Sequence, residues 1–571
     1  MGKKIIELFM ENKIVENKSN FKIGILIKDF KMNKFEKEII DNLSLDKNFK
    51  IFAILEKKPN KNFIKKFLFL FKKNSLLRNL EILFFNFIIF CEKIILNYFI
   101  KELGELDNKF VIDKKKFFKI IEVNPIYSKR EIFSEYSQDD YNKIKNENLD
   151  IVVRGNVSEI FRNNKLKISK IGILSFHHGN NLWNRGGPPG FWETYLKKSD
   201  TGFVIQLLDE KLDDGKVLFR GEFATKRLYT INKHNLLSES NYFLIKVLRD
   251  ILYNKNISFE TKKKSQVQIF KTPKIKISIN YILQKTFLFT NLLWNKFITK
   301  KKQTWFVCYS RKRFDKLNLK ESIRIDNFKN RYFADPFCYS KNNKDYIFVE
   351  DYCFKKKKGS ISVIEIDKEN NQKVYENIIE ENFHMSFPFI FDFQNELYMI
   401  PETFSANALK LYKCTNFPNK WEFCYNLISD IKCVDPIIIK YDNLYYLIIS
   451  KGRNNFDSQL QILYSESPIS QSWKTHKLNP VYFSLKQGRN GGHIKIHNKT
   501  IRVSQSFGIN RYGDNQYGKQ ILLNHIKNIT PEKFEEEIVK EIQANFKEDL
   551  LGIHHMNGNE SFTVFDYCLY N

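Results

Sequence analysis

The first half of the chain alternates short apolar runs with amphipathic stretches. A helical spacing of apolar residues occurs at 33–43 and again, as a closing helix, at 235–252. Apolar runs that would form strands lie at 21–27, 49–55, 149–153, 171–174 and 203–208. Because strands and helices in this order are typical of a largely parallel sheet, we predict an α/β domain over 21–254 after a charged leader at 1–20.

Residues 62–103 interrupt that domain with densely apolar sequence. Leucine, isoleucine and phenylalanine dominate 67–71 and 82–90, but charged residues separate and flank the two runs. No clean run reaches the roughly 18 to 20 apolar residues that a transmembrane helix needs. We predict a helical hairpin packed on the domain or on a partner. The alternative is peripheral contact with an anionic membrane, helped by Lys65, Lys66, Lys72 and Lys73.

The second half shows a different, strand-like pattern. Residues 255–302 are lysine-rich and change character repeatedly, which predicts a linker with one short amphipathic helix at 286–297. Beyond it, three units share a proline, a strand, a polar turn and a second strand. Their prolines, Pro336, Pro388 and Pro436, lie roughly 50 residues apart, which is the period of a propeller blade. With two degenerate units near 492–494 and 552–554, the pattern predicts an all-β, five-bladed β-propeller over 303–571.

Composition narrows the functional classes. Hydrophobic residues make up 43% and aromatic residues 15% of the chain, enough for packed cores. The formal net charge of +29 would suit nucleic acid, but the lysines are spread along the whole chain and no nucleic-acid-binding module is recognisable. None of the eight cysteines forms a Cys-x-x-Cys pair, so we expect no metal site. The first residues lack the apolar core of a signal peptide, so we expect a cytoplasmic protein.

Candidate acid–base chemistry lies within 171–216. His177 follows one apolar run and Asp213 follows the next, with a glycine- and proline-rich loop between them. Open parallel sheets place the carboxyl ends of neighbouring strands along one edge, so we expect these two side chains to lie close together. Arg154 and Gly155 follow an earlier run and should reach the same edge.

This stretch resembles the formyltransferase family. His177 stands in place of the family histidine, Arg185 and Gly186 fall at the family's spacing from it, and Leu-Asp-Asp-Gly at 212–215 matches the family's Leu-Asp-Thr-Gly. The resemblance implies a Rossmann-like formyltransferase domain that uses 10-formyltetrahydrofolate as co-substrate. It also implies His177 and Asp213 as catalytic residues, with Ser175 at the position of the family's catalytic asparagine.

The same resemblance assigns the neighbouring residues. Arg185 would shape the mouth of the substrate site, and the co-substrate would be held by Arg154, Gly155, Leu207 and Asp209. The alternative is a repurposed fold in which His177 merely packs a turn, because motif matches of this kind remain hypotheses.

The second half carries several short signatures. They are Ala-Asp-Pro-Phe at 334–337, His-Met-Ser-Phe-Pro-Phe at 384–389, Ile-Pro-Glu at 400–402, Phe-Pro-Asn-Lys-Trp at 417–421 and Tyr-Gly at 517–518. They resemble the propellers of furanosidase-like glycosidases and the amino-terminal domain of plant glucosamine inositolphosphorylceramide transferases. In such glycosidases, carboxylates point into the centre of the propeller. The resemblance therefore implies substrate binding by Asp335, Glu350, Glu402 and Asp435.

Two features weigh against a hydrolase. Phe387 stands where the second unit would carry an acid, and an Asp-Pro pair can also simply start a turn. We therefore predict an enzyme that moves a formyl group from 10-formyltetrahydrofolate to an amine, on an amino sugar of a surface glycan.

Two other functions stay open. One is a carbohydrate-active glycosyltransferase or glycosidase-like protein centred on the propeller, and the other is a non-catalytic glycan-binding module. In each case the expected partner is a glycan or amino-sugar acceptor and not a nucleic acid. Contact of 62–103 with the inner membrane face is the further possibility.

Overall fold

The protein forms two compact units. The computed structural model describes residues 21–57, 75–100, 108–128, 132–157, 159–209, 215–252, 269–294, 297–298, 301–451, 458–496, 499–510 and 515–570. The first unit comprises the described residues up to Trp192 together with those in Phe203–Arg220 and Tyr229–Asn280. The second comprises Glu193–Gly202, Gly221–Leu228 and the described residues from Tyr281 on.

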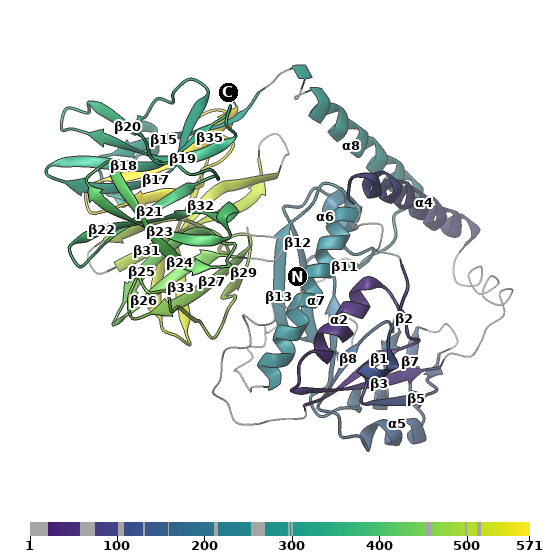
Figure 1. Ribbon diagram of the computed structural model, residues 1–571. Coiled ribbons are helices and arrows are strands. Elements are labelled where there is room, and N and C mark those ends of the chain that lie inside the picture. Colours follow the sequence, from purple (N-terminus) through teal and green to yellow (C-terminus); the bar gives the residue numbers. More distant parts are fainter. Residues whose placement is uncertain are drawn as a thin grey trace. The chain divides into compact units, whose positions relative to one another are not determined.

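A seven-stranded sheet forms the middle of the first unit (Figure 1). Its order is β13-β12-β10-β8-β1-β3-β5. The strands are β1 (Phe21–Ile27), β3 (Phe49–Glu56), β5 (Lys119–Val123), β8 (Ile151–Arg154), β10 (Ile173–His177), β12 (Asp200–Leu207) and β13 (Lys216–Ala224). The run from β10 through β8, β1 and β3 to β5 is parallel throughout. Consecutive buried residues in β1 and β8 fit strands covered on both faces.

One strand differs in direction from the sequence expectation. β12 pairs antiparallel with β10, so that His177 lies opposite Val204 and Leu174 opposite Leu207. The carboxyl end of β12 therefore lies beside the amino end of β10. The argument that parallel strand ends meet at one edge does not apply to this pair.

The helices of the first unit are α2 (Lys34–Ser44), α4 (Leu76–Phe99), α5 (Gln138–Lys145), α6 (Phe191–Tyr195), α7 (Tyr229–Leu252) and the start of α8 (Ile275–Trp294). Asn33 begins α2 with a capping box, because its side chain accepts the Glu36 backbone N–H while the Glu36 carboxylate accepts the Asn33 N–H. α7 begins at Tyr229, six residues before the predicted start. α8 is a 20-residue helix where only a short one at 286–297 was predicted.

Shorter elements complete the first unit. They are β2 (Lys31–Met32), β4 (Phe110–Val111), β6 (Ile126–Tyr127), β7 (Phe133–Glu135), β9 (Ile160–Phe161), β11 (Arg185–Gly186), β14 (Ile269–Phe270), η2 (Lys114–Lys116) and η3 (Asn163–Lys167). β11 and β14 form a two-stranded parallel ladder, so the chain after α7 returns to the loop that follows His177.

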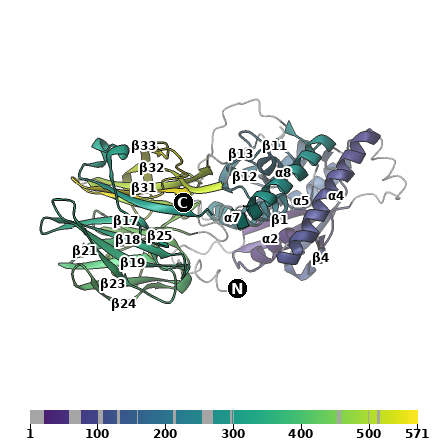
Figure 2. The same cartoon turned by 90° about the horizontal axis from the view of Figure 1, so that it is seen from above.

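The apolar insert contains one long helix. Residues 58–74 and 101–107 lie outside the described residues, and the part between them is α4, with 24 residues. By length and composition α4 could cross a membrane, which the sequence reasoning had excluded. Figure 2 shows α4 at the outside of this unit. Its inner face packs through Phe85, whose ring lies edge-on to Phe191 at 5.0 Å and near Tyr229 at 6.1 Å.

The second unit is a ring of five antiparallel blades (Figures 1 and 2). Blade 1 is β17 (Arg331–Lys341), β18 (Lys344–Cys353), β19 (Lys358–Ile366) and β20 (Gln372–Ile379). Blade 2 is β21 (Ser386–Phe393), β22 (Glu396–Glu402), β23 (Ala408–Asn416) and β24 (Lys420–Ser429). Blade 3 is β25 (Val434–Tyr441), β26 (Leu444–Ser450), β27 (Gln459–Ser465), β28 (Lys474–Thr475) and β29 (Tyr482–Phe483).

The two ends of the second unit meet in the last blade. Blade 4 is β30 (Asn490–Ile496), β31 (Lys499–Ile509), β32 (Asn515–Ile529) and β33 (Phe534–Gln543). Blade 5 joins β34 (Met556–Gly558) and β35 (Thr563–Tyr570) to β15 (Gln303–Ser310) and β16 (Ile323–Arg324). The eight-residue ladder between β15 and β35 closes the ring. A five-bladed propeller was the prediction from the proline period.

A β-bulge marks the innermost strand of four blades. The pairing register shifts between Ala334 and Phe337, and at the corresponding points of β21, β25 and β30. In the first three blades the bulged residue has a positive φ: 50° at Asp335, 48° at Phe387 and 53° at Asp435. A bulge adds one residue to a strand and redirects its side chain. The repeated Asp-Pro and Phe-Pro pairs are therefore bulges that turn one side chain per blade toward the ring axis.

Candidate active site at the centre of the propeller

Four acidic residues lie at the same end of the first three blades. Asp335 and Asp435 occupy the bulges of β17 and β25. Glu350 lies on β18 opposite Ala334, and Glu402 ends β22 opposite Ser386. All four are buried, with residue exposures between 2% and 9%. Together with His554 and Asp566 they form what we call the central cluster.

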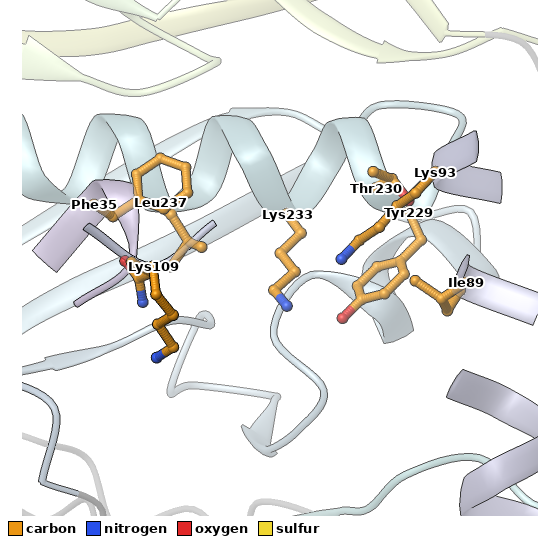
Figure 3. A pocket seen from close by; sticks show the side chains of 9 residues that line it. Phe35, Ile89, Lys93, Lys109, Tyr229, Thr230, Lys233 and Leu237 are labelled. Atoms are coloured by element: carbon orange, nitrogen blue, oxygen red, sulfur yellow. The ribbon is translucent and has the colours of Figure 1, made fainter. Parts of the chain in front are cut away.

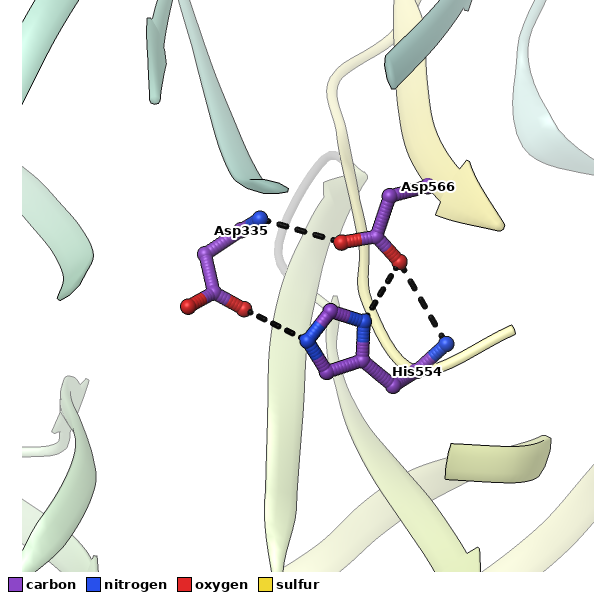
Figure 4. A group of neighbouring side chains, drawn as sticks. All are labelled: Asp335, His554 and Asp566. Atoms are coloured by element: carbon purple, nitrogen blue, oxygen red, sulfur yellow. Dashed lines mark hydrogen bonds and ion pairs between the residues drawn. The ribbon is translucent and has the colours of Figure 1, made fainter. Parts of the chain in front are cut away.

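Three side chains of the cluster are linked in a row by hydrogen bonds and ion pairs (Figure 4). His554 Nε2 lies 3.1 Å from Asp335 Oδ1, and His554 Nδ1 lies 2.7 Å from Asp566 Oδ1. Asp566 is fully buried and also accepts backbone N–H groups of Asp335 at 3.0 Å, His554 at 3.3 Å and His555 at 3.0 Å. Asp335 Oδ2 in turn accepts the backbone N–H of Phe387 at 3.2 Å. Every polar atom of these three side chains thus has a defined partner.

The two carboxylates fix the protonation of the imidazole. Burial lowers the pKa of His554, but the charges of Asp566 and Asp335 outweigh it and raise that pKa to about 10. Burial raises the pKa of Asp335, but the charge of His554 outweighs it and holds that pKa below its usual value. At neutral pH, His554 is therefore a buried cation and Asp335 a buried carboxylate.

The two glutamates of the cluster, unlike Asp335, keep their protons. Burial raises the pKa of Glu350, and the negative charge of Asp335 raises it further, to well above its usual value. Burial and the charge of Asp435 do the same to Glu402. Because like charges this close disfavour double ionisation, Glu350 and Glu402 hold their protons where Asp335 does not.

The fourth acid is paired with an arginine. Arg489 Nε donates to Asp435 Oδ2 at 2.6 Å, and Gln505 Nε2 donates to the same oxygen at 3.2 Å. Burial raises the pKa of Asp435 although Arg489 acts against this. The backbone N–H of Asp435 donates to Glu402 Oε2 at 3.3 Å, which links the second and third blades.

Aromatic and basic side chains surround the cluster. The ring of Trp305 lies 3.8 Å from that of His554, and Tyr517 contacts the same imidazole at 5.6 Å. His384 Nε2 lies 3.7 Å from Glu350 Oε1, and its Nδ1 accepts the Gly359 N–H at 2.9 Å. The side chain of His384 is 35% exposed and that of Arg489 is 19% exposed. These two residues connect the buried acids to the surface.

The spacing of Asp335, His554 and Asp566 would also suit a metal ion, since one ligand atom from each lies within 4.8 Å of the others. In the structure both ring nitrogens of His554 lie within hydrogen-bond distance of a carboxylate oxygen, so these three residues form a hydrogen-bonded row.

The predicted catalytic residues of the first unit are only partly described. Ser175 and His177 lie two residues apart on β10, are buried and face the same side of the sheet. His177 Nε2 lies 3.1 Å from the Asn184 carbonyl oxygen, and Ser175 Oγ donates to the Phe176 carbonyl oxygen at 3.2 Å. Asp213 lies outside the described residues, so the structure does not test its approach to His177.

The residues predicted to hold the co-substrate lie at the end of β8, in the loop after it and at the end of β12. Arg154 donates to the carbonyl oxygens of Val157 at 2.8 Å and Glu159 at 3.1 Å, and so closes its own loop. Gly155 lies so close to β1 that a Cβ there would be 2.5 Å from the Leu26 carbonyl oxygen. The antiparallel direction of β12 separates the other two, Leu207 and Asp209, from His177 by the length of β10. Arg185, predicted to shape the mouth of the site, lies on β11 and is half-buried.

Sequence reasoning found four members of the central cluster and missed two. The sequence marks His554 only as part of a degenerate blade, and Asp566 lies in an apolar strand without any motif. Arg489 was also missed, although the Arg-Asn-Gly-Gly-His segment at 489–493 is the fourth-blade equivalent of the Asp-Pro bulges. The signal that could have found them is the blade repeat itself, carried to blades 4 and 5.

The fold and site define a five-bladed propeller with an acidic, partly protonated centre. A family profile for glucosamine inositolphosphorylceramide transferase 1, N-terminal, matches residues 320–565. The curated protein of that name from Arabidopsis thaliana is 32% identical over 234 residues, which is 40% of this chain and 30% of the relative. Its counterpart from Oryza sativa subsp. indica is 32% identical over 216 residues, covering 37% and 28%. This chain therefore spans under a third of the length of these relatives.

Solved structures show distant likenesses. The catalytic domain of a GH62 α-L-arabinofuranosidase from Coprinopsis cinerea covers 41% of this chain and 90% of its own, at a TM-score of 0.31 and 10% identity. A thermostable family-43 glycoside hydrolase covers 42% and 88%, at a TM-score of 0.32 and 11% identity. Likenesses at this level carry no argument about what this chain does.

The predicted formyltransferase activity is wrong, and so is the predicted 10-formyltetrahydrofolate co-substrate. The family profile and the curated relatives are sugar transferases by name. The resemblance over 171–216 depended on a few short matches with Ser175 in place of an asparagine, whereas the profile match extends over residues 320–565. The alternative centred on the propeller fits the findings better.

Proposed function

We propose that this chain is a carbohydrate-active transferase of sugar groups and that a substrate sugar binds at the central cluster. The observation that carries the proposal is the division of protons among buried carboxyl groups. Glu350 is held protonated by burial and by Asp335, while Asp335 is held ionised by His554. Chemistry at a glycosidic bond needs one group that gives a proton and one that takes it.

Each member of the cluster then has a role. Glu350 would protonate the oxygen that leaves the sugar, and Asp335 would take the proton of the attacking hydroxyl. Glu402 and Asp435 would hydrogen-bond the sugar hydroxyls. His554 and Asp566 would be positioning residues, because they hold Asp335 in place and keep it ionised.

The names of the relatives suggest which substrates to try. They contain an amino sugar, glucosamine, and a lipid acceptor, inositolphosphorylceramide. We therefore propose transfer of an amino sugar to a glycan or lipid that carries inositol phosphate. Phe387, which replaces an acid at the second bulge, favours transfer or binding over hydrolysis.

The test uses the full chain with a panel of nucleotide-linked and lipid-linked amino sugars and an inositol phosphorylceramide acceptor. Products are followed by mass spectrometry. Glu350→Gln and Asp335→Asn should each lower the rate of transfer by about a hundredfold or more, as loss of a general acid or base does. Glu535→Gln, which removes an exposed carboxylate on β33, is the matched control and should have full activity.

The other outcomes are equally clear. Release of free sugar without transfer would make the protein a hydrolase and overturn the proposal. Saturable sugar binding without any turnover would favour the second candidate, a glycan-binding module, which Phe387 also supports. Full activity in Glu350→Gln would remove the central cluster from the chemistry.

A further inference from the structure

A pocket of about 240 Å³ lies in the first unit, far along the chain from the propeller strands (Figure 3). It is bounded by the start of α2, the middle of α4 and the first turns of α7. Three lysines line it: Lys93 from α4, Lys109 just before β4, and Lys233 from α7. Figure 3 shows the ammonium groups of Lys93 and Lys233 and the hydroxyl of Tyr229 pointing toward the same space.

The electrostatics of the pocket favour an anion. Among the residues that the structure describes, the lining contains three lysines and no carboxylate. The amino end of the 24-residue helix α7 lies in the same wall, and a helix amino terminus adds partial positive charge. Two acids lie close to this wall: Glu92 accepts the Thr230 backbone N–H at 2.7 Å, and Glu36 caps α2 and interacts with the charge of Lys109.

One buried hydroxyl in this wall is without a partner. Thr230 is 1% exposed and lines the pocket, and its Oγ1 makes no hydrogen bond within the described part of the chain. Leaving such a group unsatisfied costs free energy in a folded protein. A ligand oxygen in the pocket would supply the missing partner, and a phosphate oxygen fits both this hydroxyl and the lysines.

The helix that forms one wall of the pocket also exposes an apolar stripe. Leu83, Phe87, Phe90 and Ile94 are each more than half exposed and recur every three or four residues. With Leu76, Leu80 and Tyr98 the stripe runs for about 33 Å along α4, given a rise of about 1.5 Å per residue. An unpartnered apolar surface of this length marks a site of interaction with lipid or protein.

The face of α4 opposite the exposed stripe limits how this helix can contact lipid. Phe85 and Ile89 on that face are buried, and Phe85 packs against Phe191 and Tyr229. A helix packed along one side on the rest of the first unit cannot have lipid all round it. It can lie in the membrane surface with its apolar stripe among the acyl chains and Lys93 at the headgroups. Lys93 also lines the pocket.

We propose that the pocket binds the phosphate of an anionic lipid headgroup while the exposed stripe of α4 enters the same leaflet. A free phosphate ester shares the headgroup's chemistry. The stripe on α4 beside the pocket favours the lipid, because only a lipid occupies both. The proposal concerns attachment and is independent of sugar transfer at the propeller.

Sedimentation of the full chain with vesicles tests the attachment. The vesicles contain phosphatidylcholine alone, or phosphatidylcholine with phosphatidylinositol. Because each lysine near an anionic surface contributes about fivefold, Lys93→Ala combined with Lys233→Ala should weaken binding to the anionic vesicles about 25-fold. The control variant, Lys355→Ala with Lys357→Ala, removes the same charge from an exposed propeller turn and should weaken binding to the anionic vesicles far less. Phe87→Ser with Phe90→Ser should reduce binding to both kinds of vesicle.

Titration with soluble inositol 1-phosphate and with inorganic phosphate separates the headgroup from a free ion. Thr230→Val should lower the affinity for inositol 1-phosphate about tenfold, in line with the loss of a hydrogen bond to a charged group. It should leave the Tm equal or higher, because the hydroxyl it removes has no partner within the protein.

Three results would overturn the proposal. The first is equal loss of vesicle binding in the pocket and control lysine pairs. The second is binding to anionic vesicles that Phe87→Ser with Phe90→Ser does not change. The third is saturation by inorganic phosphate as tight as by the headgroup, which would identify a free anion as the ligand. Sugar transfer by these variants in detergent solution should be unchanged. Failure of the lipid-attachment proposal can therefore be distinguished from failure of the proposed sugar transfer at the propeller.

Discussion

Replacing Asp566 by asparagine should destabilise the propeller, because it breaks the hydrogen-bonded row formed by Asp335, His554 and Asp566. The carboxylate accepts three backbone N–H groups and the His554 ring, all within 3.3 Å. An asparagine keeps one oxygen and places an amide NH₂ where the second oxygen stood. In that position it faces other N–H donors, so at least one buried donor loses its acceptor.

The magnitude follows from the imidazole. The rise in the pKa of His554 from 6.5 to about 10 corresponds to about 5 kcal/mol in favour of its protonated form. Asp566 and Asp335 share this stabilisation, so removing one charge costs about 2–3 kcal/mol, and the unsatisfied donor adds about 1–3 kcal/mol. The sum agrees with about 3–5 kcal/mol for breaking a buried charged pair. At about 2–4 °C per kcal/mol, the Tm of the propeller should fall by about 10 °C.

Calorimetry of the full chain, with Glu535→Gln as control, measures this change. The pH dependence has a definite sign. Because the folded-state pKa of His554 is raised, its contribution is fully present below pH 6.5 and is lost as the pH rises toward 10. The Tm difference between wild type and Asp566→Asn should therefore be largest near pH 6 and should narrow steadily as the pH rises to 10. A Tm equal to that of the control, or a difference that grows with pH, would refute the reasoning.

Three further predictions concern other contacts. Gly359→Ala should lower both the Tm and the affinity for sugar, since its Cβ would lie 2.5 Å from the Met385 carbonyl oxygen and 2.9 Å from Glu350 Oε1; an unchanged affinity by calorimetric titration would contradict this. Chelators should leave sugar binding unaffected, because both ring nitrogens of His554 are already paired with carboxylate oxygens, and recovery of lost binding by added Zn²⁺ would show the opposite. Lys165→Met should destabilise the first unit in urea by about 3–5 kcal/mol, because it removes the cation paired with the buried Glu56 carboxylate at 2.5 Å and leaves only the Tyr136 hydroxyl bonded to that oxygen, and adding Glu56→Gln should recover much of the loss.

The sequence predicted the architecture of the second unit well because its signals are local. Each blade consists of adjacent antiparallel strands, so its pattern repeats within about 50 residues. The proline after each bulge and the positive φ that precedes it are properties of two neighbouring residues. Asp335, Phe387 and Asp435 are therefore recognisable as equivalent positions from the sequence alone.

Local reasoning did not give the strand directions of the first unit. His177 and Asp213 were expected to meet because their strands were taken to be parallel, but β12 runs antiparallel to β10, and a strand's direction depends on its partner strands and not on its own residues. The apolar insert was expected to be a packed hairpin. Its sequence alone does not reveal that α4 buries Phe85 and Ile89 and exposes Leu83, Phe87 and Phe90.

The sequence by itself determined where the strands, bulges and acids of the propeller lie. Only the tertiary structure decided which of them act together. Asp335 and Asp566 are 231 positions apart and meet because the ladder between β15 and β35 closes the ring. The tertiary structure also sets the protonation states, since the pKa values of Glu350, Asp335 and His554 depend on burial and on charges from different blades. Neither burial nor a distant charge is a property of the residue or of its neighbours in sequence.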